Sequence, residues 1–163
     1  MQVGECLASP WSRTPSECKA APPILIVMFD QSGPSAEVLL VREALAGEIP
    51  GARAILARHG WSSTRQGTFI VVFDPFEQNV RGAAVVRRRC HCTYELAAWA
   101  VGDDRVGTIE HRLVRAVADR VRRGGGRRVV VSLCALSPEQ VAVLTASGFI
   151  HNAGSEVELV LDD

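Results

Sequence analysis

The sequence predicts a single α/β domain in which helices flank a mixed, mostly antiparallel central sheet. The chain has 163 residues, which suits one domain, and 47% of them are hydrophobic, enough for a continuous core. β-Rich segments alternate with amphipathic helical ones, and three of the β-rich segments follow one another across short turns. We expect residues 23–163 to form the domain. Residues 1–22 are polar and contain three prolines, so we expect a tail or irregular lead-in.

The domain begins with a predicted strand and two predicted helices. The apolar run Ile24–Phe29 predicts a buried strand. Ser35 is a candidate N-cap for a first helix. Apolar residues follow it at helical spacing: Val38, Val41 and Leu45. We expect Pro50-Gly51 to break this helix and Ala52–His59 to form a second, short one.

Three strands and a long helix fill the middle of the chain. The strands are predicted over Thr68–Phe73, Val80–Arg88 and Thr93–Val101, and the short turns between them imply an antiparallel meander. The helix is predicted over Gly107–Arg123 and ends at a run of three glycines. One of its faces is apolar: Ile109, Leu113, Val117 and Val121.

The carboxyl-terminal part continues with a strand, a helix and a strand. Arg128–Leu133 is rich in β-branched residues, which favours a strand. Ser137 is a predicted N-cap, with proline at the first helical position, and the helix that it starts stops at Gly148. Glu156–Leu161 alternates as a half-solvated strand does. A further short strand over 149–152 is left open.

Composition limits the classes of partner. The formal net charge is zero, and no aromatic residues are interleaved with the basic clusters, so we expect no nucleic-acid partner. The apolar run near the start is too short for a signal core or a membrane span, so we expect a cytoplasmic location and no membrane association. The five cysteines are then expected to be reduced. Cys90-His91-Cys92 lacks the paired spacing of a zinc site, so we expect no metal.

The most specific pattern lies between Thr93 and Phe149. An apolar strand enters the turn Asp104-Arg105-Val106-Gly107-Thr108-Ile109, and a helix follows. The later helix ends in Leu144-Thr145-Ala146-Ser147-Gly148-Phe149. This order and these residues resemble the GNAT family of N-acetyltransferases, which transfer an acyl group from acyl-coenzyme A. The resemblance covers roughly Ile24 to Leu161.

The resemblance implies a binding site for acetyl-CoA as co-substrate. In the family, the strand before the turn carries a bulge and splays from its parallel neighbour, and the pantetheine arm pairs with its backbone in the gap. The pyrophosphate binds to amides at the helix start, where the helix dipole favours negative charge. Carried over residue by residue, the cofactor-binding residues are Trp99, Ala100, Val101, Arg105, Val106, Gly107, Thr108, Ile109 and Ser137.

Glu95 is the candidate catalytic residue. Acyl transfer to an amine needs a base, and some family members place a catalytic glutamate at this position relative to the bulge. Glu95 lies in an otherwise apolar strand, and strand alternation predicts that it shares a face with Ala97 and Trp99. The resemblance therefore implies direct transfer to an amine with Glu95 as the base. The alternative for Glu95 is an exposed residue on the solvated face of a sheet.

Two interpretations of the function stay open. The first is an acyl-CoA-dependent N-acyltransferase, and the second is a non-catalytic GNAT-fold module for partner binding or regulation. Asp104, Ile109 and Leu144 depart from the family pattern and favour the module. The sequence does not identify the acceptor amine, a small molecule or a protein, although Trp61 and Phe76 are candidates for its site. A homodimer is also left open.

Overall fold

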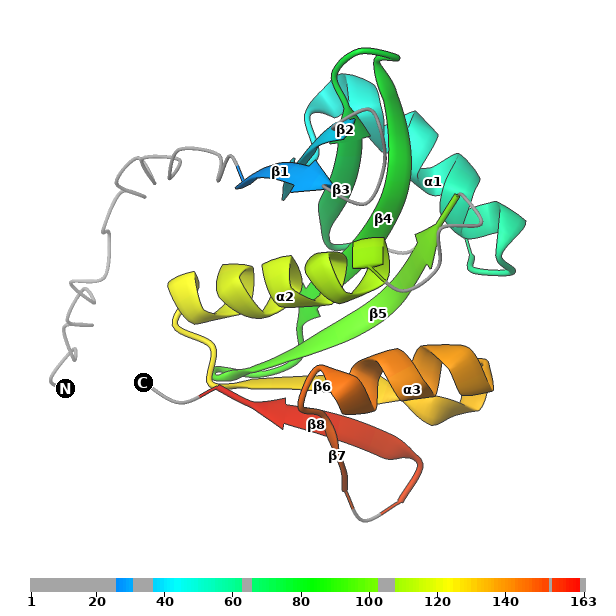
Figure 1. Ribbon diagram of the computed structural model, residues 1–163. Helices are drawn as coiled ribbons and strands as arrows, with labels where there is room; N and C mark the ends of the chain where they lie inside the picture. Colours follow the sequence, from blue (N-terminus) through cyan, green and yellow to red (C-terminus); the bar gives the residue numbers. More distant parts are fainter. Residues whose placement is uncertain (1–25, 31–36, 63–65, 103–107, 153, 162–163) are drawn as a thin grey trace, which may run out of the picture.

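The computed structural model describes residues 26–30, 37–62, 66–102, 108–152 and 154–161 (Figure 1). Within this part, eight strands form one sheet in the order β1-β2-β3-β4-β5-β6-β8-β7. Their bounds are β1 Ile26–Asp30, β2 Glu37–Glu43, β3 Thr68–Asp74, β4 Asn79–Arg88, β5 Thr93–Val101, β6 Arg128–Ser132, β7 Ile150–His151 and β8 Glu156–Val160. Neighbouring strands run antiparallel except β5 and β6, which run parallel. The predicted mixed, mostly antiparallel sheet is confirmed.

Helices pack on both faces of the sheet. Helix α1, Ile49–Arg58, covers one face, and helices α2, Thr108–Arg123, and α3, Pro138–Ala146, cover the other (Figure 1). Two short 3₁₀ turns precede α1 and α3: Ala46–Glu48 and Leu133–Ala135. In the described part of the chain, no helix is both long and apolar enough to span a membrane.

The core consists of two clusters that share the central strands. In β3, Val71 packs toward α1 whereas its neighbour Val72 packs toward α2, because successive side chains of a strand point to opposite faces. Both valines have no exposed surface. Residues 69–73 of β3 and 82–86 of β4 are therefore continuously apolar, as expected of strand segments covered on both sides.

The helix predicted after Ser35 is wrong. Ser35 lies outside the described residues, and the segment behind it forms β2, whose partners are β1 and β3. Leu39 and Val41, two residues apart, are buried in the α2-side cluster, whereas Leu45 is 58% exposed. A short apolar run satisfies helical and strand spacing equally well, and pairing with two neighbouring strands decided the outcome here.

The predicted helix break at Pro50-Gly51 is also wrong. Both residues lie in the first turn of α1, with proline at the second helical position. A backbone amide at that position has no intrahelical acceptor. A proline there, which has no amide hydrogen, therefore costs the helix no hydrogen bond. The two predicted amino-terminal helices are thus replaced by one strand and one helix. The later predicted elements are confirmed within one or two residues at most boundaries.

Candidate functional site

Strand β5 diverges from its parallel neighbour β6. The two strands are paired only over three residues each, and the last pair is Glu95 with Val130. From Leu96 to Val101, β5 continues without a partner in β6. Main-chain groups on this edge of β5 are therefore free of β6, and such an edge can pair with an added extended chain.

A bulge in β5 lies next to the divergence. Val85 pairs with Ala98 and Val86 with Leu96, which leaves Ala97 as the extra residue on β5. The bulge reverses the alternation of side chains along the strand. Ala97 and Ala98 both pack in the α1-side cluster, whereas Leu96 and Trp99 pack in the α2-side cluster.

The bulge corrects one predicted feature of Glu95. By alternation from Leu96, Glu95 points to the α1 side of the sheet, as Ala97 does. Trp99 was expected on the same face, but it lies on the opposite face because the extra residue shifts the pattern by one. The position of the bulge depends on how β5 pairs with β4, which residue spacing alone does not reveal.

Arg87 holds the Glu95 carboxylate. The two residues lie directly opposite each other on β4 and β5. Arg87 Nε donates to Glu95 Oε2 at 2.8 Å, and Nη2 donates to Oε1 at 3.0 Å. The hydrogen bonds that the Arg87 guanidinium donates to Glu95, together with the charge of that carboxylate, raise the pKa of Arg87. The Glu95 side chain is 18% exposed, so it is neither fully solvated nor buried in an apolar environment.

A cavity of about 430 Å³ opens over Glu95. Its lining residues carry three guanidinium groups and two carboxylates: Arg87, Arg88, Arg89, Glu95 and Glu156. Arg89 Nη1 donates to Glu156 Oε1 at 2.7 Å, which ties the β4–β5 hairpin to the start of β8. The cavity therefore lies beside the end of the parallel β5–β6 pairing, at the point where the two strands separate.

Gln140 of α3 reaches across to the free edge of β5. Its Nε2 donates to the carbonyl oxygen of Trp99 at 3.4 Å. The same side chain accepts from the Ser137 amide at 3.1 Å, and Ser137 Oγ accepts from the Gln140 amide at 3.3 Å. This reciprocal capping box confirms Ser137 as the N-cap. The sequence analysis did not single out Gln140, although the spacing Ser-x-x-Gln indicates a capping box.

Not every predicted cofactor residue falls within the described part of the chain. Arg105, Val106 and Gly107 lie outside it. Thr108 begins α2, so its amide is among the first four of the helix, which lack intrahelical acceptors. The Ile109 side chain is only 8% exposed and packs in the α2-side core. The predicted phosphate site would bind its ligand through the backbone amide of Ile109 and not through the side chain.

The first turn of α2 also contains a buried carboxyl group. Glu110 is 7% exposed, and no residue in the described part of the chain forms a hydrogen bond with its Oε2. Burial raises the pKa of this carboxyl, and the charges of His111 and His59 lower it in part. Nothing in the spacing of the helix distinguished Glu110 from a solvated glutamate.

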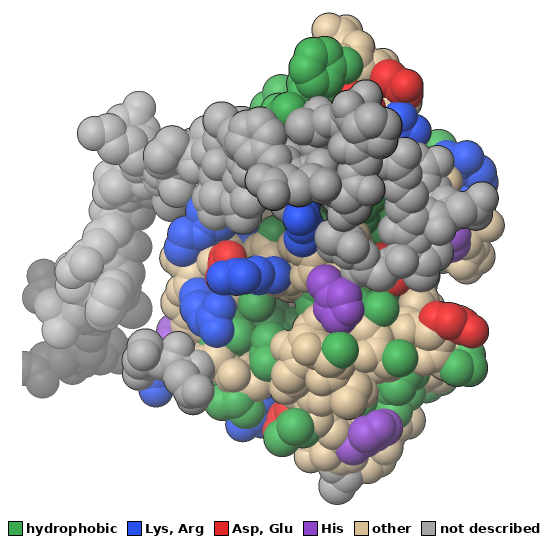
Figure 2. Space-filling model, in the orientation of Figure 1, with side chains coloured by type: hydrophobic (Ala, Val, Ile, Leu, Met, Phe, Trp, Pro, Cys, Tyr) green, Lys and Arg blue, Asp and Glu red, His purple; other side chains and the backbone are tan. Residues whose placement is uncertain are grey.

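A separate groove of about 420 Å³ runs between α2, the end of α3 and β8. Its floor is apolar, with Val114, Ala118 and Leu159, and its rim includes Arg115 and Arg122. In Figure 2, hydrophobic side chains gather at the centre of this face between basic side chains and a histidine.

Among the described residues, no group of three or more His, Cys, Asp or Glu side chains could hold a metal ion.

The two acceptor-site candidates from the sequence are placed differently. Trp61 is half-buried and packs against both core clusters. Phe76 is 78% exposed in the turn between β3 and β4. Neither residue lines the cavity over Glu95.

No protein-family model matches the chain, and no curated protein sequence matches it. Solved structures do. A GNAT family N-acetyltransferase from Escherichia coli in complex with CoA is similar with a TM-score of 0.62 and 18% identity, over 82% of this chain and 86% of that one.

Two further structures show the same arrangement. Ribosomal-protein-S18-alanine N-acetyltransferase from Escherichia coli is similar with a TM-score of 0.61 and 16% identity, over 76% of this chain and 92% of that one. N-acetylglutamate synthase from Neisseria gonorrhoeae, complexed with coenzyme A and L-arginine, has a TM-score of 0.60 and 17% identity, over 77% of this chain and 34% of that one. With its bulged strand diverging from a parallel neighbour, the chain has the fold of the GNAT N-acetyltransferases.

Proposed function

We propose that the chain transfers an acyl group from acyl-CoA, with acetyl-CoA as the expected donor, directly to an amine. The observation that carries this proposal is the divergence of bulged β5 from β6 beyond Glu95. A free strand edge suits the pantetheine arm, whose amides can pair with it as an added strand would. The solved structures with coenzyme A support the same class of donor.

The residues of the opening have distinct roles in this proposal. The backbones of Trp99, Ala100 and Val101 pair with the pantetheine arm, and the amides at the start of α2 hold the pyrophosphate. A strand amide polarises the thioester carbonyl and stabilises the oxyanion that forms on attack. Ser137 contributes its hydroxyl at the start of α3, next to the same opening.

Glu95 serves as the base. The amine nitrogen attacks the thioester carbon, its proton goes to the Glu95 carboxylate, and the thiolate leaves as the new amide forms. Arg87 donates one hydrogen bond to each carboxylate oxygen, and the second lone pair of either oxygen can accept the proton of the amine. The leaving thiolate takes its proton from water, because Leu144 stands in the α2-side core with no exposed surface and has no proton to give.

The first test separates binding from chemistry. Glu95→Gln should leave the acetyl-CoA dissociation constant nearly unchanged and lower turnover about 100-fold or more, since a positioned base contributes that much. Calorimetric titration gives the first quantity, and release of free thiol in the presence of an amine panel gives the second. Turnover unchanged in Glu95→Gln would place the base elsewhere.

A non-catalytic module is the second candidate. Two observations favour it: both oxygens of Glu95 are engaged by Arg87, and the buried Leu144 offers no acid. The same calorimetric titration discriminates between the two functions. Absence of heat at high acetyl-CoA concentration would favour the module, whereas saturable binding favours the acyltransferase.

A further inference from the structure

We propose that Cys90 and Cys92 form a thiol–disulfide exchange site at the tip of the β4–β5 hairpin. A small-molecule disulfide, such as oxidised glutathione, would convert the two thiols into one internal disulfide. The described part of the chain has three free cysteines, Cys90, Cys92 and Cys134, and all three are exposed. Cys90 and Cys92 lie one residue apart in the same turn. This site does not depend on the proposed acyl transfer.

The hairpin turn brings the two thiols together. The amides of Arg89 and Cys90 both donate to the carbonyl oxygen of Thr93, at 2.9 and 3.1 Å, and the backbone bends at residues 90–92. Two residues along an extended strand span about 6.6 Å, close to the upper limit of about 6.8 Å between the Cα atoms of a disulfide. A bend shortens this separation, and the Cys92 side chain forms a hydrogen bond with Cys90.

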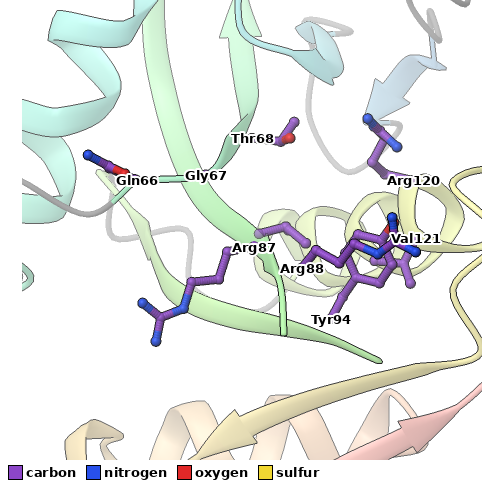
Figure 3. A pocket seen from close by; sticks show the side chains of 9 residues that line it. Gln66, Gly67, Thr68, Arg87, Arg88, Tyr94, Arg120 and Val121 are labelled. Carbon is purple, nitrogen blue, oxygen red and sulfur yellow. The ribbon is translucent and has the colours of Figure 1, made fainter. Parts of the chain in front are cut away.

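Arg88 holds the tip of the turn. Its Nε donates to the Cys90 carbonyl at 3.2 Å, and its Nη2 donates to the His91 carbonyl at 2.7 Å. The same Nη2 lies 3.2 Å from His91 Nδ1, which must accept because a guanidinium only donates. In Figure 3, Arg88 lies against Tyr94 in a cavity of about 530 Å³ beside the end of α2, whereas Arg87 points away from them. The turn is thus fixed from its α2 side.

The backbone of Cys92 is fixed by the start of β6. Its carbonyl oxygen accepts from the amides of Arg127 and Arg128, at 2.8 and 3.2 Å. Both cysteines of the turn therefore have a backbone held by neighbouring groups, while their thiols face solvent. Because the two thiols are already placed side by side, closing a bond between them costs little conformational entropy.

Cys90 is the thiol that attacks. Hydrogen bonds from the Thr93 side chain and backbone lower the pKa of Cys90, hydrogen bonds from Cys92 add to this effect, and burial opposes it in part. The Arg89 guanidinium is near enough that the Cys90 thiolate helps to raise the pKa of Arg89, after the larger effect of its partner Glu156. Because a thiolate is the nucleophile in disulfide exchange, these groups favour attack by Cys90.

The exchange takes two steps. The Cys90 thiolate attacks one sulfur of the small-molecule disulfide, a mixed disulfide forms, and one thiolate leaves and takes up a proton. Cys92 then loses its proton and attacks the Cys90 sulfur, so the internal disulfide forms and the second small thiol leaves. Overall, two protein thiols are oxidised and one small disulfide is reduced to two thiols. An excess of the reduced small thiol reverses both steps.

Mass spectrometry of the full chain tests the site. The protein is incubated with oxidised glutathione at neutral pH, alkylated, and cut with trypsin, which releases residues 90–105 with Cys90 and Cys92 as their only cysteines. We expect this peptide to lose two hydrogens in mass and to escape alkylation, and excess reduced glutathione to restore both thiols. Cys134 lies in the separate peptide 129–163, has no second cysteine there, and should stop at the mixed disulfide.

Two variants assign the roles of the thiols. Cys92→Ser should accumulate the mixed disulfide at Cys90, because no second thiol displaces the bound glutathione. Cys90→Ser should lose most of the reaction within residues 90–105. Far-ultraviolet circular dichroism checks that both substitutions leave the fold intact. Equal mixed disulfides at Cys90, Cys92 and Cys134, without an internal disulfide, would identify ordinary surface thiols and overturn the inference. An unmodified peptide 90–105, or an unchanged reaction in Cys90→Ser, would overturn it as well.

Discussion

Glu110 is a buried carboxyl group whose charge opposes folding at neutral pH. Burial raises its pKa, and His111 and His59 offset only part of this effect. A carboxyl with a raised pKa binds its proton more tightly in the folded state. Its protonated form therefore stabilises the fold fully below the pKa of the unfolded chain, and this contribution is lost as the pH rises through the higher folded-state pKa.

We expect Glu110→Gln to be more stable than the natural sequence at pH 7, because the amide keeps the shape of the side chain without a buried charge. The difference should shrink toward pH 4, where the natural carboxyl becomes protonated. Urea unfolding at several pH values measures it. A glutamine variant that is less stable at pH 7 would mean that the helix dipole stabilises the carboxylate more than burial penalises it.

Helix α3 bridges the opening beside β5 through a single side chain. Gln140 donates to the Trp99 carbonyl, one of the groups that the pantetheine arm is proposed to pair with. The bound arm and Gln140 therefore compete for the same acceptor. We expect Gln140→Ala to tighten acetyl-CoA binding about threefold, the worth of a weak hydrogen bond. Calorimetric titration checks this.

The same variant loses half of the capping box and should be slightly less stable. Gln140→Glu separates the two effects, because it still accepts from the Ser137 amide but cannot donate to Trp99. Weaker acetyl-CoA binding in both variants would show that Gln140 assists the cofactor instead of competing with it.

Elements with an end signal of their own were predictable from the sequence, and elements that depend on partners were not. The start of α3 is set locally by Ser137 and the proline that follows it, and the end of α2 is set by the three glycines after it. Both helices were therefore predicted. The segment at β2 lacked such signals. The register that brings Arg87 opposite Glu95, and the bulge at Ala97, arise from pairing between β4 and β5. Residue spacing within one strand contains no information about that pairing.

The whole molecule is organised around one sheet whose central strands belong to both core clusters. Val71 and Val72 are adjacent in β3 and fully buried, yet they pack toward different helices. Because the same backbone positions both, loosening either cluster should weaken the other. The shared strands therefore favour a single cooperative domain, as the length and composition of the chain predict.

We expect Val71→Ala and Val72→Ala each to lower the free energy of unfolding by about 2 kcal/mol, since each removes buried methyl groups and leaves a cavity. Each variant should still unfold in one transition. The measurement is urea unfolding followed by far-ultraviolet circular dichroism and by the fluorescence of Trp99, the buried tryptophan of the α2-side cluster, in a background that carries Trp11→Phe and Trp61→Phe. The matched control is Ala54→Gly on the exposed side of α1, which should cost about 1 kcal/mol through helix propensity alone. If Val71→Ala shifted the circular dichroism transition but left the fluorescence transition in place, the two clusters would unfold separately. The opening beside β5 would then lie between two independent units, and ligand binding there would stabilise only one of them.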